Sequence, residues 1–188
     1  WPADDAALVE RYLEHVRVEK RLAERTVELY ALDLGKLRQQ AAQAGVRASW
    51  GTTFESYTRN NVNATQRLLE GVKTSKVKRL VYASSSSVYG ETLDLPMRET
   101  SRPRPFSPYG VTKLAGEHLA ELYRHNYGLA TASLRYFSVY GPRQRPEMAI
   151  HQFARLITDG QPIPCFGDGS SRRDYTYVED IVAGIVAA

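Results

Sequence analysis

Apolar residues in the first part of the chain recur at helical spacing. Between residues 5 and 43 they include Leu8, Tyr12, Val16, Val27, Tyr30, Leu34 and Leu37. A spacing of three to four residues predicts one apolar stripe along each of two helices. Gly45 is a suitable residue to end the second helix, because glycine readily adopts the left-handed conformation common at that position. The pattern therefore predicts a helical hairpin over residues 1–44.

The remainder of the chain alternates between helix-like and strand-like patterns. Amphipathic helices are expected over residues 54–72, 107–127, 148–159 and from 178 onward, and short apolar strands over 79–83, 130–137 and 163–166. Ser107 and Pro108 suit the N-cap and first position of a helix. Strands that alternate with helices indicate an α/β fold with parallel pairing. We therefore expect a second domain, over residues 45–188, of this class.

Composition narrows the possible functions. The chain has 188 residues, a net charge of +4 and a single cysteine, Cys165. That charge is too small to indicate a nucleic-acid partner, and one cysteine cannot form an internal disulfide or a cysteine-built metal site, so no metal is expected. No apolar run approaches the roughly 18 residues of a membrane span, and the first residues do not resemble a signal peptide. We expect a cytoplasmic protein with no membrane partner.

Tyr109 and Lys113 stand four residues apart in the helix expected over residues 107–127, so they share one helix face. A nearby ammonium favours the phenolate and lowers the pKa of a tyrosine from its usual value near 10. Upstream, the serine run 84–87 follows the strand expected over residues 79–83, where α/β sheets bind ligands. This combination predicts a catalytic site. The alternative is a solvated Tyr–Lys pair and a serine-rich turn.

Four segments together resemble the extended short-chain dehydrogenase/reductase family. They are residues 81–90 (VYASSSSVYG), 107–113 (SPYGVTK), 134–143 (LRYFSVYGPR) and 167–178, which includes RDYTYV. The resemblance implies a Rossmann-like parallel sheet with flanking helices, NAD as the cofactor and a nucleotide sugar as the substrate. It implies that Tyr109 is the catalytic base, that Lys113 binds the nicotinamide ribose and that the Ser85 hydroxyl orients the sugar. Ser84 joins Tyr109 and Lys113 in the implied cofactor site.

Within that family, residues 141–149 resemble the UDP-glucuronate 4-epimerases, and Ser138 stands where many relatives carry asparagine. The substrate-binding residues implied are Ser85, Ser86, Ser138, Arg143, Arg145 and Arg173. Arginine suits this role because its guanidinium forks match phosphates and carboxylates. The alternative is that these arginines lie on solvated loops or pair with nearby aspartates. The implied reaction is NAD-dependent epimerisation of a nucleotide sugar at carbon four through a 4-keto intermediate, in a homodimer.

The sequence also departs from that family. Its Gly-x-x-Gly-x-x-Gly turn, which cradles the cofactor's pyrophosphate, has no counterpart, so a truncated sheet is expected. Residues 5–44 instead resemble the start of the DNA-clamping domain of Xer-type tyrosine recombinases, which suggests a chimera joined near residues 39–45. One alternative is therefore an inert chimera with a structural or DNA-associated role, the only case with DNA as a partner. Another is a nucleotide-sugar dehydratase or decarboxylase; Ser86 and Ser87 count against dehydration, since dehydratases usually carry acidic residues there.

Overall fold

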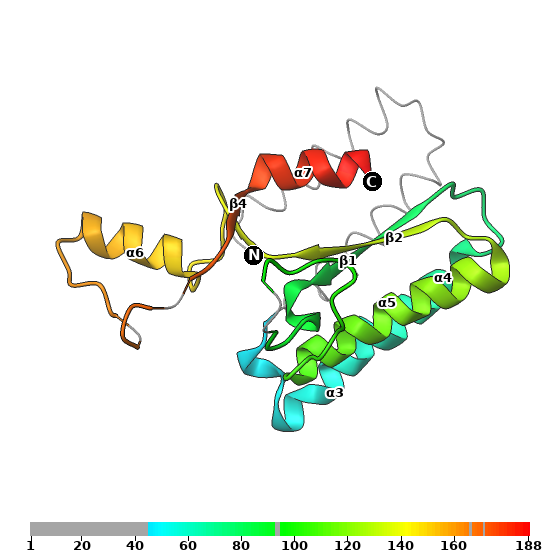
Figure 1. Ribbon diagram of the computed structural model, residues 1–188, viewed down its shortest axis with the longest axis horizontal. Helices are drawn as coiled ribbons and strands as arrows, with labels where there is room; N and C mark the ends of the chain where they lie inside the picture. The colour runs from blue at the N-terminus through cyan, green and yellow to red at the C-terminus, as the bar shows by residue number, and fades with distance from the viewer. Residues whose placement is uncertain (1–44, 93–94, 166, 171) are drawn as a thin grey trace, which may run out of the picture. The chain divides into compact units, whose positions relative to one another are not determined.

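The computed structural model describes residues 45–92, 95–165, 167–170 and 172–188 (Figure 1). The expected hairpin over residues 1–44, and with it the recombinase resemblance, lies outside the described residues. Ser49–Ala188 form one compact unit. Its strands are β1 (Leu80–Ser85), β2 (Thr131–Tyr136), β3 (Ser138–Tyr140) and β4 (Tyr175–Tyr177).

The helices differ in type and length. The α-helices are α3 (Phe54–Tyr57), α4 (Ala64–Val72), α5 (Pro108–Tyr127), α6 (Ala149–Thr158) and α7 (Val178–Ala187). A π-helical segment, η4 (Thr58–Asn63), joins α3 to α4. The short 3-10 helices are η2 (Arg47–Ser49), η3 (Gly51–Thr53) and η5 (Ser86–Val88). None of the helices among these described residues is both long and apolar enough to cross a membrane.

The strands pair in parallel, which confirms the predicted α/β class. β1 pairs with β2 from Leu80↔Thr131 to Ser85↔Tyr136, and β3 pairs with β4 from Ser138↔Tyr175 to Tyr140↔Tyr177. Figure 1 shows α4 and α5 running side by side, with α5 packed against β1 and β2. Because β1 and β2 are parallel, their carboxyl ends meet at one edge, where such sheets bind ligands.

Helix α5 has the ends that the sequence predicts. The Ser107 hydroxyl accepts a hydrogen bond from the Gly110 amide at 3.1 Å, and Pro108 occupies the first turn. At the other end Gly128 caps the helix in the left-handed conformation, with φ of 68°. Such caps satisfy backbone groups that a helix leaves unpaired. They fix the helix so that its first turn lies at the end of β1.

The structure differs from the sequence-based prediction in three places. Within the strand expected over residues 163–166, residues 163–165 form no strand, because Pro164 lacks the amide donor that a ladder needs, and residue 166 lies outside the described residues. Strands β3 and β4 were not predicted, since three residues are too few to show a period of two. The helix expected over residues 54–72 is helical throughout but contains the π-helical turn of η4, which apolar spacing does not reveal.

The apolar core joins α4, α5 and the start of β1. Leu69 is fully buried and packs with Tyr123 and Leu129, and partly buried Val72, Leu80 and Leu119 surround them. Burying one such leucine contributes roughly 1.5–3 kcal/mol. This core lies at the amino end of β1, so the polar residues at the carboxyl end of the strand are held by an independent set of contacts.

Candidate active site

The serines at the end of strand β1 have a defined orientation. Ser85 is the last residue of the strand and the N-cap of η5. Its hydroxyl accepts a hydrogen bond from the Ser87 amide at 3.2 Å and lies 3.2 Å from the Ser87 hydroxyl. Ser86 begins η5, and its carbonyl oxygen accepts a hydrogen bond from the Tyr89 amide at 3.0 Å. Capping therefore fixes the direction in which the Ser85 hydroxyl can point.

Tyr109 meets Ser85, as the sequence suggested. Tyr109 lies in the first turn of α5, and the Ser85 hydroxyl is close enough to lower the pKa of its phenol. Its ring also packs edge-on against buried Tyr57, with ring centroids 6.1 Å apart and planes at 78°. The two hydroxyls that the sequence placed in one site are thus brought together from residues far apart in the chain.

Lys113 lies one turn beyond Tyr109 and turns toward the strand. Its Nζ donates a hydrogen bond to the carbonyl oxygen of Ala83 at 2.9 Å. The same ammonium lies 5.2 Å from the Tyr82 ring centroid and 6.0 Å from that of Tyr109, within reach of a cation–π attraction. Burial lowers the pKa of Lys113, because a low-dielectric environment disfavours the charged form.

The pKa of Tyr109 lies above its ordinary value. Burial is the largest cause, and the charge that Tyr57 carries when ionised adds to it, whereas the nearby Ser85 hydroxyl and the positive charge of Arg145 act in the opposite direction. The prediction that Lys113 brings the pKa of Tyr109 below 10 is therefore wrong for this structure. The physical reason is that the ammonium is directed at the Ala83 carbonyl, while the surrounding protein desolvates the phenol.

Ser84 does not face the site. Its side chain is 3% exposed and donates a hydrogen bond to Oε1 of Glu117 on α5. Alternate residues of a strand point to opposite faces, and β1 turns Tyr82 and Ser84 toward α5. The Ser84 hydroxyl is therefore buried and already bonded, and the cofactor contact expected for Ser84 stays a prediction.

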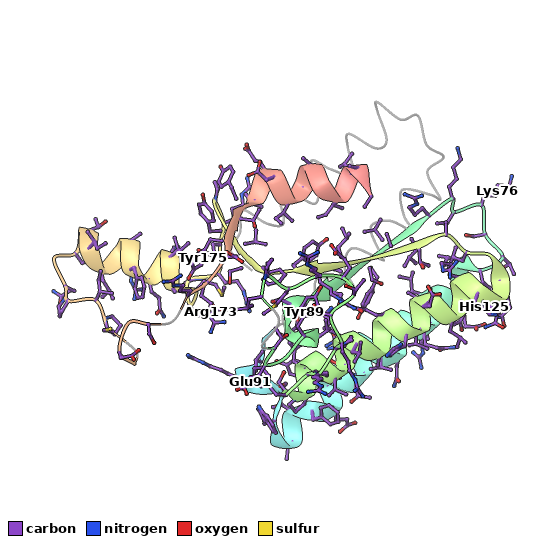
Figure 2. All side chains as sticks on the ribbon, viewed as in Figure 1. Lys76, Tyr89, Glu91, His125, Arg173 and Tyr175 are labelled. Carbon is purple, nitrogen blue, oxygen red and sulfur yellow. The ribbon has the colours of Figure 1, made fainter. Side chains whose placement is uncertain are left out.

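The remaining predicted residues lie after β2. Ser138 begins β3 and is half-buried, and exposed Arg173 precedes Tyr175 at the start of β4 (Figure 2). Exposed Arg145 pairs with Glu147 at 3.2 Å, and its charge lowers the pKa of Tyr109. The structure thus relates Arg145 electrostatically to Tyr109, and it records no such link for Ser138 or Arg173 among the described residues.

Arg143 has an unusual backbone. Its φ is 65°, and among the residues that the structure describes it is the only non-glycine residue with positive φ. The left-handed region costs an ordinary residue roughly 1–2 kcal/mol, and such strain is concentrated at functional sites. The strain at this exposed arginine is an argument, independent of the motif, for a functional role.

Sequence reasoning missed the contacts between η4 and α5. Asn61 donates a hydrogen bond to the hydroxyl of Thr112 at 2.9 Å, and that hydroxyl donates to the carbonyl oxygen of Tyr109 at 2.8 Å. Thr112 is only 2% exposed. Single π-helical turns often occur at functional sites, but nothing in the apolar pattern marks one here. The segment thus supports the helix turn that carries both Tyr109 and Lys113.

Tyr109 and Lys113 lie one helical turn apart, beside a strand that ends in Ser85, and together they form one polar site. The profile of the NAD dependent epimerase/dehydratase family matches residues 20–188. The chain belongs to this family. The match begins at residue 20, inside the segment expected to be a recombinase-like hairpin.

Relatives within the epimerase/dehydratase family are similar over most of the chain. An uncharacterised UDP-glucose epimerase, YtcB, from Bacillus subtilis is 43% identical over 182 residues, which cover 93% of this chain and 57% of that protein. A UDP-glucuronate 4-epimerase from Thermodesulfobacterium geofontis is 43% identical over 148 residues, covering 79% of this chain and 46% of the relative. The chain thus spans about half the length of the curated relatives it matches.

A solved structure shares the fold of the described part. The UDP-glucuronic acid 4-epimerase from Bacillus cereus, in complex with UDP-glucuronic acid and NAD, aligns with a TM-score of 0.72 and 48% identity. The alignment covers 77% of this chain and 46% of that chain. The epimerase/dehydratase fold expected from the four sequence motifs is confirmed.

Proposed function

We propose that this protein takes part in the NAD-dependent 4-epimerisation of UDP-glucuronate. The observation that carries the proposal is the meeting of Tyr109, Ser85 and Lys113 at the carboxyl end of β1, where the Ser85 hydroxyl lowers the pKa of Tyr109 and Lys113 bonds to the carbonyl oxygen of Ala83. The names of the relatives add support, since a UDP-glucuronate 4-epimerase and a structure holding UDP-glucuronic acid with NAD are both more than 40% identical to this chain. Ser86 and Ser87, in place of acidic residues, favour epimerisation over dehydration.

The donor set of the site fits the nicotinamide side of NAD. An ammonium has three N–H donors, and only one of those on Lys113 is needed for the bond to the Ala83 carbonyl. The others are available for ribose hydroxyls, and the Tyr109 phenol is a further donor. NAD, when bound, supplies the acceptor and later the donor of the hydride that leaves and returns to carbon four.

Tyr109 is the proposed general base. The sugar's 4-hydroxyl gives its proton to the Tyr109 oxygen as that carbon is oxidised, and the same proton returns to the 4-oxygen after the keto sugar has rotated. Ser85 lies beside Tyr109 and orients the 4-oxygen during both transfers. A base should have a pKa near the working pH. Because burial raises the pKa of Tyr109, the positive charge of Arg145 works in favour of catalysis.

Three arginines are proposed for the anionic groups of the substrate. Arg143 and Arg145 would hold the sugar carboxylate, Ser86 and Ser138 are proposed for the same role, and Arg173 would contact the diphosphate. Guanidinium groups bind carboxylates and phosphates through paired, charge-assisted hydrogen bonds. Arg145 has the strongest support, because its charge already acts on Tyr109. A substrate carboxylate would have to displace Glu147 from Arg145.

A homodimer through α4 and α5 belongs to the same proposal. Leu68 on α4 is 56% exposed, and Val111 and Leu122 on α5 are 50% and 53% exposed. Val111 and Leu122 are separated by three helical turns, so they lie on one face. Clustered apolar exposure of this kind marks interaction surfaces. Light scattering should give twice the chain mass, and Leu122→Asp should give the monomer mass; a monomeric wild type would contradict a dimer.

An epimerisation assay tests the proposed function. The purified chain is incubated with NAD and UDP-glucuronate, and ¹H NMR follows the appearance of the 4-epimer. Tyr109→Phe should reduce the rate by about 10²–10⁴-fold, the usual contribution of a general acid–base group. Arg145→Met should impair turnover of UDP-glucuronate more than that of UDP-glucose, while Arg124→Met, an exposed arginine on α5, serves as the control. No turnover by a folded, NAD-bound chain would contradict the proposal.

A further inference from the structure

Side chains on one stripe of α5 meet three successive residues of β1. Tyr109, Lys113 and Glu117 are spaced four residues apart, so they lie on one helix face. Lys113 bonds to the carbonyl oxygen of Ala83 and Glu117 accepts a hydrogen bond from the Ser84 hydroxyl. The Tyr109 phenol lies close enough to the Ser85 hydroxyl for that hydroxyl to lower its pKa. The helix is thus fixed to the strand at the two residues that precede the catalytic serine.

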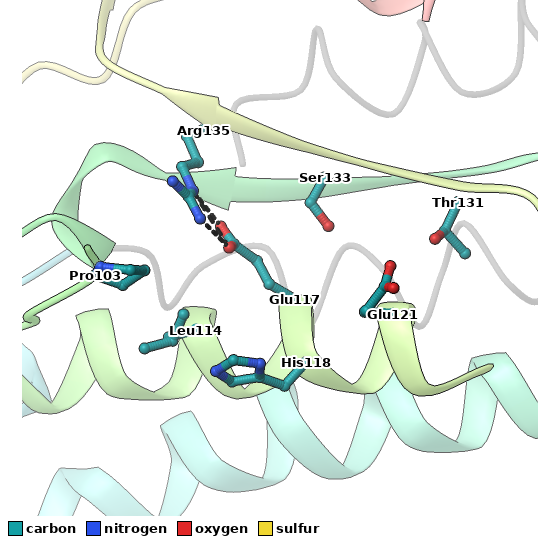
Figure 3. A pocket seen from close by; sticks show the side chains of 8 residues that line it. All are labelled: Pro103, Leu114, Glu117, His118, Glu121, Thr131, Ser133 and Arg135. Carbon is teal, nitrogen blue, oxygen red and sulfur yellow. Dashed lines mark hydrogen bonds and ion pairs between the residues drawn. The ribbon is translucent and has the colours of Figure 1, made fainter. Parts of the chain in front are cut away.

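Glu117 also forms a two-pronged ion pair with Arg135 on β2. Nη2 of Arg135 lies 2.8 Å from Oε2 of Glu117, and Nε lies 3.0 Å from Oε1 (Figure 3). The two side chains are only 19% and 10% exposed. Ser84 and Arg135 are register partners in the parallel pair, so both leave the same face of the sheet and reach the same carboxylate. One carboxylate therefore ties α5 to both strands.

Arg135 extends this contact toward the site. Its guanidinium carbon lies 4.7 Å from the ring centroid of Tyr89, which follows η5, and Nη1 donates to the carbonyl oxygen of Glu99 at 3.4 Å. The ring of Tyr89 is 4% exposed. Ser85 lies between these two contacts in the chain, because Ser84, which bonds to Glu117, precedes it and Tyr89, which packs on Arg135, follows η5. The ion pair therefore restrains the chain before and after Ser85.

We infer that Glu117 and Arg135 are positioning residues that set the separation of Ser85 from Tyr109. The inference rests on the proposed function for its catalytic meaning, whereas its geometry stands independently. A guanidinium–carboxylate fork fixes orientation as well as distance. The two hydroxyls come from different elements, so their separation depends on how far α5 lies from β1. A misplacement of about 1 Å can cost about 10²-fold in rate.

The first test does not require substrate or NAD. The chain is labelled with ¹³C-tyrosine, the Tyr109 resonance is assigned with Tyr109→Phe, and its titration is followed by NMR. Glu117→Gln keeps the size of the side chain but weakens the two-pronged contact with Arg135. It should raise the pKa of Tyr109, because the nearby Ser85 hydroxyl lowers that pKa in the wild type. Glu121→Gln is the matched control: Glu121 lies one turn further along α5 and pairs with Arg124 at 2.6 Å on the exposed surface.

The outcomes separate positioning from simple stabilisation. A higher pKa of Tyr109 in folded Glu117→Gln, with no change in Glu121→Gln, supports the inference. An unchanged pKa of Tyr109 in folded Glu117→Gln overturns it. If Glu117→Gln does not fold, Arg135→Lys is used instead, because it keeps the positive charge and loses the two-pronged ion pair. A raised pKa of Tyr109 in that variant supports the inference, and an unchanged pKa overturns it. In the epimerisation assay, kcat should fall about 10²-fold while KM stays constant. If the chain proves inactive, the proposed function fails while the titration result still decides the positioning role.

Discussion

The Nζ of Lys113 donates a hydrogen bond to the carbonyl oxygen of Ala83 at 2.9 Å, so the lysine that the motif assigns to the cofactor also ties α5 to β1. The Ala83 residue is exposed, and water can take the place of the ammonium at its carbonyl. The lysine itself is in a desolvating environment that lowers its pKa. The hydrogen bond therefore stabilises the contact between α5 and β1, whereas burial of the charged ammonium opposes it.

Lys113→Met should leave stability nearly unchanged while it removes NAD binding. The variant loses one net hydrogen bond, a change of about 1 kcal/mol, and regains part of it by removing a buried charge. Urea unfolding measures the stability and calorimetry the NAD affinity. Lys73→Met, which removes an exposed pair with Glu70, should keep the affinity of the wild type. A loss of several kcal/mol in Lys113→Met would show that the lysine is mainly structural.

Gly116→Ala should destabilise the chain, because α5 has no room for a methyl group there. A Cβ at this position would overlap the hydroxyl and ring of Tyr82, which is 8% exposed. Overpacking of this kind costs roughly 1–3 kcal/mol. Gly71→Ala on α4 is the matched control, since nothing lies within 4 Å of its Cβ, and it should stabilise by about 0.5–1 kcal/mol. Equal effects in denaturant unfolding would refute the packing argument.

Arg143→Gly should make the chain more stable and a poorer binder of UDP-glucuronate. Glycine adopts the φ of 65° without strain, which removes about 1 kcal/mol of cost. The same change deletes the guanidinium proposed to bind the sugar carboxylate. Thermal unfolding and titration with UDP-glucuronate, compared with UDP-glucose, provide the two readings. Unchanged discrimination between the two sugars would remove Arg143 from the substrate site.

Alkaline pH should unfold the protein partly through Tyr82. Burial is the main reason that the pKa of Tyr82 is raised above 10, and the nearby Tyr109 adds to it. A group whose folded pKa is raised contributes stability that is present below its unfolded pKa and is lost as the pH increases further. Urea midpoints should therefore fall above pH about 10, and fall less steeply in Tyr82→Phe, with both chains normalised at pH 8. Parallel curves would contradict this assignment.

The sequence predicted those features of the site that depend on neighbouring residues. Ser107, Pro108 and Gly128 define the ends of α5 through capping, which acts within a few residues. The spacing of Tyr109 and Lys113 then puts both on one face of that helix. The apolar run before the serines similarly predicted β1 and the edge at which Ser85 lies.

Features that depend on packing between distant segments could not be predicted in this way. Whether Ser84 or Ser85 faces the site depends on which face of β1 α5 covers, and a run of four serines carries no alternation that would reveal it. The direction of Lys113 depends on the Ala83 carbonyl, which only the folded pair presents. Asn61 reaches Thr112 across 51 positions of sequence, so no local pattern indicates the contact.

Calorimetric titration of the purified chain with NAD tests the central claim, that Ser85, Tyr109 and Lys113 form a working cofactor and catalytic site. The account predicts saturable binding that Tyr109→Phe weakens and Lys113→Ala largely abolishes, while the surface variant Glu121→Gln binds like the wild type. Absence of NAD binding by a chain whose circular dichroism and unfolding transition show that it is folded would contradict the account.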